Sequence, residues 1–147
     1  MKRIKLLLAA VIIAIGATAS AQQVTAISIN DLPAQAKEFV DMHFKGNKVV
    51  QVEKEAMVGI LKGYKVIFEN GAKVEFNKKG DWKEVESKVG KLPYSVVPDK
   101  IKKHIASEFP KAVILEIEKK NKGYKVEISN GLTLQFELNG DFKRFDN

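Results

Sequence analysis

The sequence predicts an α+β protein made of two tandem repeats, each a helix followed by a four-stranded antiparallel meander. Three observations support this fold class. A set of core and turn residues that begins after residue 30 recurs about 60–65 positions later. Each copy begins with apolar residues at helical spacing. Each then continues as short alternating segments separated by glycine-containing turns. We expect the copies to join into one continuous curved sheet with the helices on one face; two hinged modules are the alternative.

The repeat is clearest in its turn motifs. Residues 63–66 read Gly-Tyr-Lys-Val and recur as residues 123–126, and the Asn-Gly pair at 70–71 recurs at 130–131. The offset between the copies falls from 65 to 60 residues, so the first copy has five additional residues near 57–61. We therefore divide the chain into a signal peptide (1–21), a first repeat (22–90) and a second repeat (91–147).

Residues 1–21 have the three parts of a signal peptide. Lys2, Arg3 and Lys5 form a basic start, an apolar run of about twelve residues follows, and Ala19-Ser20-Ala21 matches the small-residue cleavage pattern. The apolar run is too short to span a bilayer. We expect cleavage before Gln22 and a periplasmic or secreted mature protein with no stable membrane anchor; an uncleaved anchor is the alternative.

The composition of the mature chain disfavours several classes of protein. The leader holds three of the 25 basic residues and none of the 18 acidic ones, so the mature chain has 22 basic and 18 acidic residues, a net charge of +4. This balance is ordinary for a soluble protein and does not indicate nucleic-acid binding. The chain has no cysteine, and about 126 residues are enough to bury a core without disulfides.

The individual elements follow from local patterns. The helices are expected to begin at Pro33 and Pro98, because proline is favoured in the first turn of a helix. Apolar residues then recur every three or four positions, and Gly46-Asn47 and Pro110 end the two helices. The expected strands are 49–55, 61–69, 72–77 and 81–86 in the first copy and 113–119, 123–129, 132–137 and 141–146 in the second.

The turn at residues 69–71 sets the register of the first hairpin. A two-residue loop would place Phe68 opposite Lys73, an apolar residue opposite a charge. A three-residue loop instead places Phe68 opposite Ala72 and keeps one face of the sheet apolar. The same logic applies to the other glycine-containing turns of both copies. These glycines therefore have a structural role and need no phosphate ligand.

The last strand of each copy conflicts with simple alternation. If Trp82 faces the helices, Glu84 and Glu86 also fall on this inner face, and the second copy has the same problem. The conflict predicts an edge position or a β-bulge at the last strand. Under uninterrupted alternation, Val85 and Phe145 are expected on the opposite, open face.

No catalytic or metal-binding motif is recognisable in the sequence. The two histidines, His43 and His104, lack the spacing of a metal pair, and the chain has no cysteine ligand. His104 matches the apolar helix position of Phe39, which indicates packing at the edge of the core. The strand glutamates are interpreted as solvated residues paired with lysines. We therefore predict no catalytic residues, no metal site, no cofactor and no enzymatic activity.

Two surfaces are candidates for binding a partner. The first is the additional apolar segment of the first copy, which either packs back on the protein or protrudes as a binding site. The second is the open face of the sheet, where apolar residues stand among charges. The residues assigned to these surfaces are Met57, Ile60 and Leu61 in the segment and Lys65, Ile67, Lys83, Val85, Lys125, Lys143 and Phe145 on the open face.

The motifs of both copies resemble one family. The Leu-Pro pair before the first helix, the Gly-Tyr-x-Val strand, the Asn-Gly turn and the Gly-Asp-aromatic turn are similar to the beta-lactamase-inhibitor-like, PepSY-like family of exported bacterial proteins, over nearly all of residues 28–147. The resemblance implies a repeat of one helix and an antiparallel sheet, and it brings no catalytic residues. It also implies a fold similar to that of secreted inhibitors that hold an enzyme with a sheet.

We therefore predict an exported, non-enzymatic protein-binding module, with inhibition of a periplasmic or secreted hydrolase or peptidase as the specific hypothesis. The alternative is an envelope protein that binds a small ligand or glycan and uses Tyr64, Tyr124 or Trp82 as stacking platforms. The expected partner is an exported protein, and no nucleic acid is expected. Self-association through unpaired edge strands is a further alternative.

Overall fold

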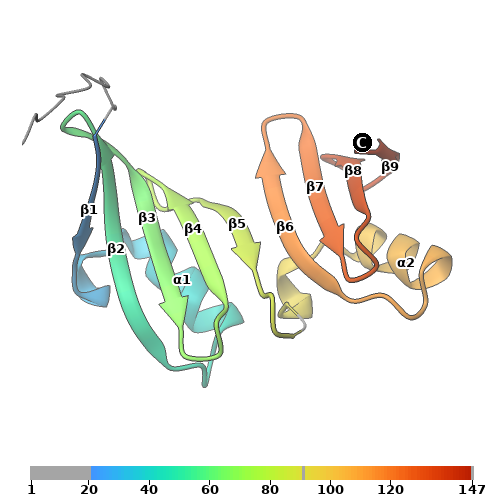
Figure 1. The fold of residues 1–147 in the computed structure, drawn as a ribbon, viewed down its shortest axis with the longest axis horizontal. Helices are drawn as coiled ribbons and strands as arrows, with labels where there is room; N and C mark the ends of the chain where they lie inside the picture. The colour runs from blue at the N-terminus through green and yellow to red at the C-terminus, as the bar shows by residue number, and fades with distance from the viewer. Residues whose placement is uncertain (1–20, 91, 147) are drawn as a thin grey trace, which may run out of the picture.

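The computed structural model describes residues 21–90 and 92–146, and over these residues it forms one nine-stranded antiparallel sheet with two α-helices (Figure 1). The strands lie in the sheet in chain order, so each strand pairs with the one before it. Both helices lie on the same face of the sheet, and the other face is open (Figure 1). Within the described residues, neither helix is long and apolar enough to cross a membrane.

The α+β class and the single continuous sheet agree with the prediction. The first repeat provides β1 (Gln22–Ala26), the 3₁₀ helix η1 (Ile29–Asp31), α1 (Ala34–His43), β2 (Val49–Met57), β3 (Ile60–Phe68), β4 (Lys73–Asn77) and β5 (Trp82–Glu86). The second provides the 3₁₀ helix η2 (Tyr94–Val96), α2 (Asp99–Glu108), β6 (Ile114–Lys120), β7 (Gly123–Ile128), β8 (Thr133–Glu137) and β9 (Phe142–Phe145). The eight expected strands are present close to their expected bounds, and β1, which pairs with β2, is an addition to them.

The hairpin between β3 and β4 has the predicted three-residue loop. The Phe68 N–H donates to the Ala72 carbonyl at 2.9 Å, and Val66 pairs with Val74. Gly71 has φ = 82°, a left-handed conformation that glycine adopts at little cost. The predicted register is therefore confirmed, and every second side chain of these strands faces the helices.

A β-bulge at the start of β5 reverses the faces of this strand. Trp82 pairs with Phe76, but Glu84 pairs with Glu75, so Lys83 is an extra residue between them. The strand β9 has the same irregularity in its pairing with β8. The sequence places Glu84 and Glu86 on the inner face with Trp82, and an edge position or a β-bulge is expected to resolve this conflict. The structure has the bulge.

The bulges make the expected placement of two residues wrong. Val85 pairs with Val74 and is fully buried on the helix side, instead of lying on the open face. Phe145 pairs with Leu134 on the same side, and its ring lies edge-on to Phe109 with the centroids 6.4 Å apart. Both placements assume uninterrupted alternation, which one extra residue in each strand inverts.

A row of buried side chains crosses the helix-covered face of the sheet. Each of six neighbouring strands contributes one fully buried aliphatic residue to it. Because the row passes from β5 to β6 without a break, the two repeats share one hydrophobic core. The row consists of Val66, Val74, Val85, Ile117, Val126 and Leu134.

Aromatic rings also connect the repeats on the helix side. Phe39 of α1 stacks on Trp82 with the ring centroids 5.9 Å apart, and Trp82 stacks on Tyr124 of β7 at 6.3 Å. The Nδ1 atom of His43 in α1 lies 2.8 Å from the Ser95 hydroxyl in η2. These contacts add ring packing and one polar contact to the shared core.

Candidate functional site

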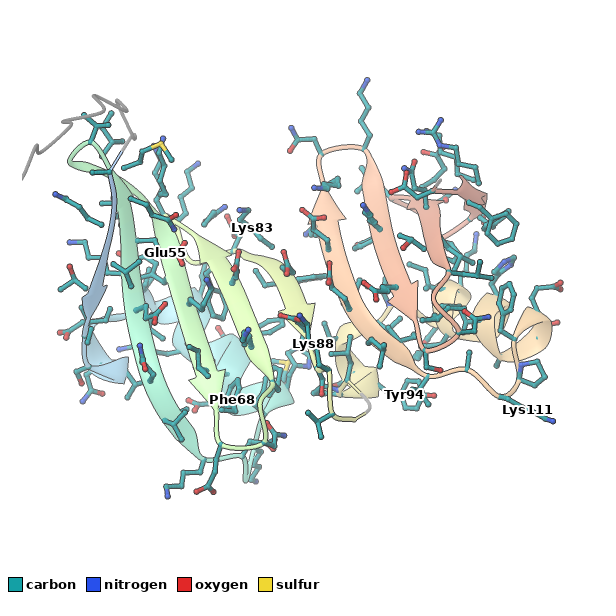
Figure 2. All side chains as sticks on the ribbon, viewed as in Figure 1. Glu55, Phe68, Lys83, Lys88, Tyr94 and Lys111 are labelled. Atoms are coloured by element: carbon teal, nitrogen blue, oxygen red, sulfur yellow. The ribbon has the colours of Figure 1, made fainter. Side chains whose placement is uncertain are left out.

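Charged side chains cover most of the open face of the sheet (Figure 2). Antiparallel pairing aligns them in rows that run across the strands. One row consists, from β2 to β9, of Glu53, Lys65, Glu75, Glu84, Glu118, Lys125, Gln135 and Arg144. The neighbouring row consists of Gln51, Ile67, Lys73, Glu86, Glu116, Glu127 and Thr133.

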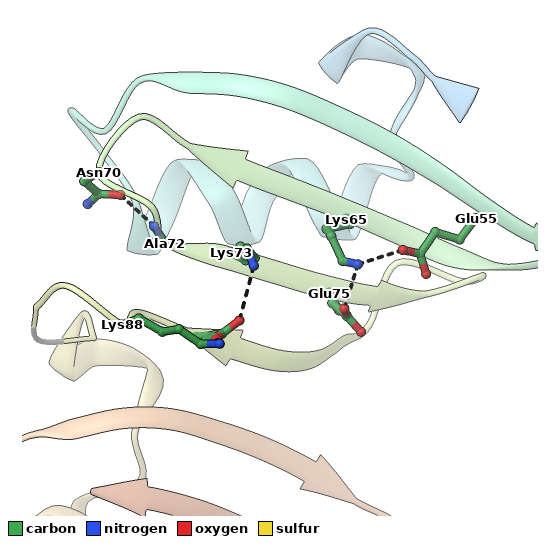
Figure 3. A network of polar contacts seen from close by, with 8 residues as sticks. Glu55, Lys65, Asn70, Ala72, Lys73, Glu75 and Lys88 are labelled. Carbon is green, nitrogen blue, oxygen red and sulfur yellow. Dashed lines mark hydrogen bonds and ion pairs between the residues drawn. The ribbon is translucent and has the colours of Figure 1, made fainter. Parts of the chain in front are cut away.

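In each repeat, the central lysine of this face is already paired within the protein. The Lys65 Nζ lies 2.8 Å from the Glu55 carboxylate and 3.1 Å from the Glu75 carboxylate (Figure 3). Burial by itself would lower the pKa of Lys65, but the hydrogen bonds to both glutamates outweigh it and raise this pKa above its ordinary value. The equivalent Lys125 lies 2.8 Å from Asp146. A partner of this face would have to compete with these pairs.

Where the two repeats meet, the open face brings carboxylates together. The strand β5 pairs with β6 so that Glu84 lies opposite Glu118 and Glu86 lies opposite Glu116. We call these four residues the acidic seam. Like charges directly opposite each other destabilise a sheet unless something neutralises them.

Ion pairs neutralise only part of the acidic seam. Glu86 lies 3.0 Å from the Nζ of Lys88, and Glu118 pairs with Lys120 of its own strand. In residues 21–90 and 92–146, the other two carboxylates of the seam, those of Glu84 and Glu116, have no ion pair. The seam therefore has carboxylate oxygens that are free to bind a cation.

Burial and mutual repulsion change the ionisation of the acidic seam. Burial, and then the charges of Glu116, Glu75 and further glutamates, raise the pKa of Glu84 to about 7. Burial, and then nearby glutamates beginning with Glu127, also raise the pKa of Glu116. At neutral pH the seam therefore favours taking up a proton or another cation.

Three carboxylates of the seam converge closely enough to share one cation. Oxygen atoms of Glu84, Glu116 and Glu118 all lie within 4.8 Å of one another. Carboxylate oxygens are the ligands that hard cations such as Ca²⁺ prefer. The histidines, His43 and His104, lie on the two helices, so this group offers no imidazole or thiolate. The donor set fits a hard divalent cation and does not fit a soft transition metal.

The residues predicted for an open-face site separate into three groups. The residues on the open face are Lys65, Ile67 and Lys125, and of these Lys125 lies opposite Glu118 of the acidic seam. Those that stand exposed at the bulges are Lys83 and Lys143. Those that lie on the helix side instead are Val85 and Phe145.

The residues predicted for the additional segment protrude from the sheet instead of packing back on the protein. The segment lengthens the hairpin between β2 and β3, where Val58 is 73% exposed and Ile60 is 62% exposed. Met57 is exposed beside them, and Leu61 is half-buried. The acidic seam lies in β5 and β6, so the two candidate surfaces are separate.

Sequence reasoning missed the acidic seam. The sequence predicts lysine-paired glutamates at the end of the first repeat, which holds for Glu86 and is wrong for Glu84. Alternating glutamates at 84–86 and 116–118 are visible in the sequence. Their meeting could have been inferred only by combining a bulge in β5 with direct pairing of β5 and β6.

The comparison with family models gives one match. The family described as “Putative beta-lactamase-inhibitor-like, PepSY-like” matches residues 19–59 and 62–144. The chain belongs to this family. The predicted resemblance is thus confirmed, and the interruption of the match falls in the protruding hairpin. None of the curated proteins matches this PepSY-like chain.

Solved structures of Bacteroides proteins are similar to this PepSY-like chain. One from Bacteroides thetaiotaomicron, described as a “putative calcium-regulated periplasmic protein”, is 36% identical with a TM-score of 0.79, and the match covers 84% of this chain and 97% of that one. Two from Bacteroides vulgatus, each described as a “putative periplasmic protein”, are 41% and 30% identical, both with TM-scores of 0.76. These matches cover 84% and 86% of this chain and 97% and 100% of the relatives. The descriptions of the relatives agree with the export predicted for this chain.

Proposed function

We propose that this chain is an exported, non-catalytic protein that binds a calcium ion at the acidic seam. The observation that supports the proposal is the convergence of oxygens from Glu84, Glu116 and Glu118 within 4.8 Å. The description of the Bacteroides thetaiotaomicron relative as calcium-regulated is an independent support. The non-catalytic part rests on the inhibitor-like family and on a sequence without a catalytic motif.

Calcium fits this donor set better than magnesium. Ca²⁺ takes about six to eight oxygen ligands in a flexible geometry, and each carboxylate of the seam can offer one or both of its oxygens. Water can complete the coordination, because the seam carboxylates are only half-buried. Mg²⁺ requires a tighter octahedral arrangement and retains its own water ligands, so we expect it to bind more weakly.

A bound dication would also remove a destabilising term from the sheet. The pairing of β5 with β6, which we call the joint between the repeats, brings four carboxylates together. Their mutual repulsion weakens this pairing. A ligand that binds the folded protein and not the unfolded chain stabilises the folded state by mass action. Calcium is therefore expected to strengthen the joint between the two repeats.

The test is a calcium titration of the mature chain 22–147 after removal of divalent cations with EDTA. The melting temperature should rise with calcium concentration, and isothermal titration calorimetry should give one site per chain. Replacing Glu84 and Glu118 with glutamine should abolish both effects, because glutamine keeps the shape of the side chain and removes its charge.

Glu53 provides the matched control for this experiment. It is the equivalent of Glu118 in the first repeat, but it lies opposite Lys65 and outside the seam. Glu53→Gln should therefore bind calcium as the wild type does. Binding that survives the seam substitutions, or no binding by the wild type at millimolar calcium, would exclude the acidic seam as a calcium site.

A second candidate function is the binding of an exported protein, with inhibition of a hydrolase or peptidase as its specific form. The inhibitor-like description of the family supports it. On the open face, Ile67 stands half-buried among charged side chains, as an apolar anchor within a polar rim does.

Inhibition can be tested with an exported hydrolase or peptidase obtained by cross-linking to the mature chain. The purified enzyme should lose activity in proportion to the added protein. The substitutions Ile67→Lys and Lys125→Glu should weaken this inhibition, and Lys111→Glu, at an exposed position away from the open face, should not. A cross-linked enzyme that keeps its full activity would contradict inhibition.

A further inference from the structure

Four hairpin turns of the sheet lie at the same end of the strands. In an antiparallel meander successive turns alternate between two edges, so the turns after β2, β4, β6 and β8 share one edge (Figure 1). We call it the hairpin edge, and it consists of residues 57–62, 77–83, 119–122 and 137–143. Three shallow hollows lie side by side along it. The first and second share the lining residues Asn77 and Asp81, and the second and third share Lys120. The hairpin edge is therefore one continuous surface.

The hairpin edge is strongly basic. It has eight exposed lysines and three acidic residues. Two of these acids are paired, Glu137 with Lys143 at 3.2 Å and Asp141 with Lys100 of α2 at 2.8 Å. Positive charge is thus concentrated at this edge, which adjoins the acidic seam where Lys120 pairs with Glu118. The eight lysines are Lys62, Lys78, Lys79, Lys83, Lys119, Lys120, Lys122 and Lys143.

Apolar side chains protrude from the same edge. Val58 is 73% exposed, Ile60 is 62% exposed and Leu138 is 54% exposed. Val58 also has φ = 51°, a left-handed conformation that is unfavourable for a β-branched residue. Asparagine or glycine is usual at this position of a two-residue hairpin turn. An apolar, strained residue at the outermost point of a hairpin indicates a role in binding rather than in folding.

The predicted leader joins the protein at this edge. Gln22, the expected first residue of the mature chain, pairs with Met57 at the end of β2. The 21 residues before it contain the apolar run that enters the membrane during export. The hairpin edge is thus the part of the folded protein at which the chain following the predicted leader begins.

We propose that the hairpin edge binds an anionic phospholipid surface. Val58, Ile60 and Leu138 enter the headgroup region, and the lysines contact the lipid phosphates. Clustered lysines are attracted to anionic membranes, and apolar side chains gain by leaving water at the interface. A hydrated polyanion such as a nucleic acid would leave the apolar tips in water, so a lipid surface accounts for both features. This proposal does not depend on calcium binding at the acidic seam.

The charge component can be tested by cosedimentation with lipid vesicles in EDTA at low salt. The mature chain should bind vesicles of phosphatidylcholine and phosphatidylglycerol, and it should not bind phosphatidylcholine alone. Each lysine near an anionic surface is worth about a fivefold change in partitioning, so Lys78→Glu with Lys122→Glu should reduce binding by at least about 25-fold. The control, Lys45→Glu with Lys111→Glu, makes the same charge change at exposed positions before β2 and β6, at the opposite ends of the strands, and should keep most of the binding. Lys111 is labelled in Figure 2.

The apolar component can be tested with a substitution that preserves the fold. Val58→Asn creates an Asn-Gly pair, which is favoured in this turn, so the melting temperature should be kept or raised while vesicle binding falls. The chain has no cysteine, so Val58→Cys can be labelled with a polarity-sensitive fluorophore. Its emission should shift to the blue with anionic vesicles. Val89→Cys, which is 83% exposed at the opposite edge, should show no shift.

These measurements decide the proposal together. Loss of binding confined to the hairpin-edge variants, with a blue shift at position 58 only, supports it. Equal binding to both kinds of vesicle, or an equal loss in the control pair, overturns it. Binding to an envelope protein with no binding to vesicles also overturns it.

Discussion

At the scale of single residues, Glu84 couples the stability of the protein to pH. Its carboxyl group is half-buried in β5 and faces Glu75 of β4 and Glu118 of β6. Burial, and then the charges of the surrounding glutamates, raise the pKa of Glu84 to about 7 from its ordinary value of 4.5. The folded protein therefore holds a proton at pH values where the unfolded chain has released it.

Without divalent cations, the free energy of unfolding should fall as the pH rises from about 4.5 to 7. In this interval the unfolded chain loses the Glu84 proton and the folded protein keeps it, so stability decreases with pH and levels off above pH 7. We expect a decrease of roughly 1 kcal/mol, because solvent screens a carboxyl that is only half-buried. Urea unfolding at several pH values in EDTA measures this change.

Glu84→Gln is the comparison for this experiment, because it should show a smaller decrease, of which the raised pKa of Glu116 is one remaining source. His43 has the opposite effect, since burial lowers the pKa of His43 and its contribution to stability is lost as the pH falls below 6.5. His43 is present in both proteins, so the difference between them isolates Glu84. A difference that stays constant across the pH range would contradict the raised pKa.

At the scale of elements, two glycines allow close approach of neighbouring strands. A Cβ atom at Gly63 of β3 would lie 2.1 Å from the backbone oxygen of Phe76 in β4. A Cβ atom at Gly123 of β7 would lie 1.9 Å from the backbone oxygen of Phe136 in β8. Both glycines begin the Gly-Tyr-Lys-Val motif. The close approach of the neighbouring strand therefore explains why glycine occupies the first position of this motif.

Gly63→Ala should lower the free energy of unfolding by roughly 2–4 kcal/mol. The carbonyl of Phe76 would have to move, and hydrogen bonds between β3 and β4 would weaken. Thermal or urea unfolding measures the loss. Gly90→Ala is the control, because the nearest atom to its Cβ would be the Ser87 hydroxyl oxygen at 4.0 Å. We expect a change below about 0.5 kcal/mol there, and equal effects at the two positions would rule out close approach as the constraint.

At the scale of the whole molecule, opposite faces of the sheet act differently on the joint between the repeats. On the helix side, Val85 pairs with Ile117 and Trp82 stacks on Tyr124, which holds the repeats together. On the open side, the acidic seam repels itself. The apolar contacts belong to one continuous core, so we expect the repeats to unfold together.

Urea unfolding of the mature chain should therefore show one transition. Fluorescence of Trp82, the only tryptophan, and far-ultraviolet circular dichroism should give the same midpoint. Val85→Ala should lower the free energy of unfolding by roughly 2–3 kcal/mol without dividing the transition. Val89→Ala, at an exposed position, should have little effect. Different midpoints for the two probes would mean that the repeats unfold independently.

Features that depend on local conformational preferences could be predicted from the sequence. The loop at residues 69–71 follows from the left-handed preference of glycine and from the need to keep one face apolar. The helices after Pro33 and Pro98 follow from helical spacing of apolar residues. The family follows from the recurrence of these same motifs. The turn and the helices are each encoded within about ten residues of chain, and the family is encoded by the repetition of such local motifs.

The residues that meet where β5 pairs with β6 could not be predicted, because they depend on how the whole sheet assembles. Simple alternation flagged a conflict in β5, but an edge position and a bulge both relieve it, and the extra residue Lys83 moved Val85 into the core. The pairing of β5 with β6 then placed Glu84 opposite Glu118, which lies 34 positions further along the chain. Local conformational preference belongs to a short stretch of sequence, whereas the partner of a strand depends on the assembly of the whole sheet. The acidic seam is a property of that assembly.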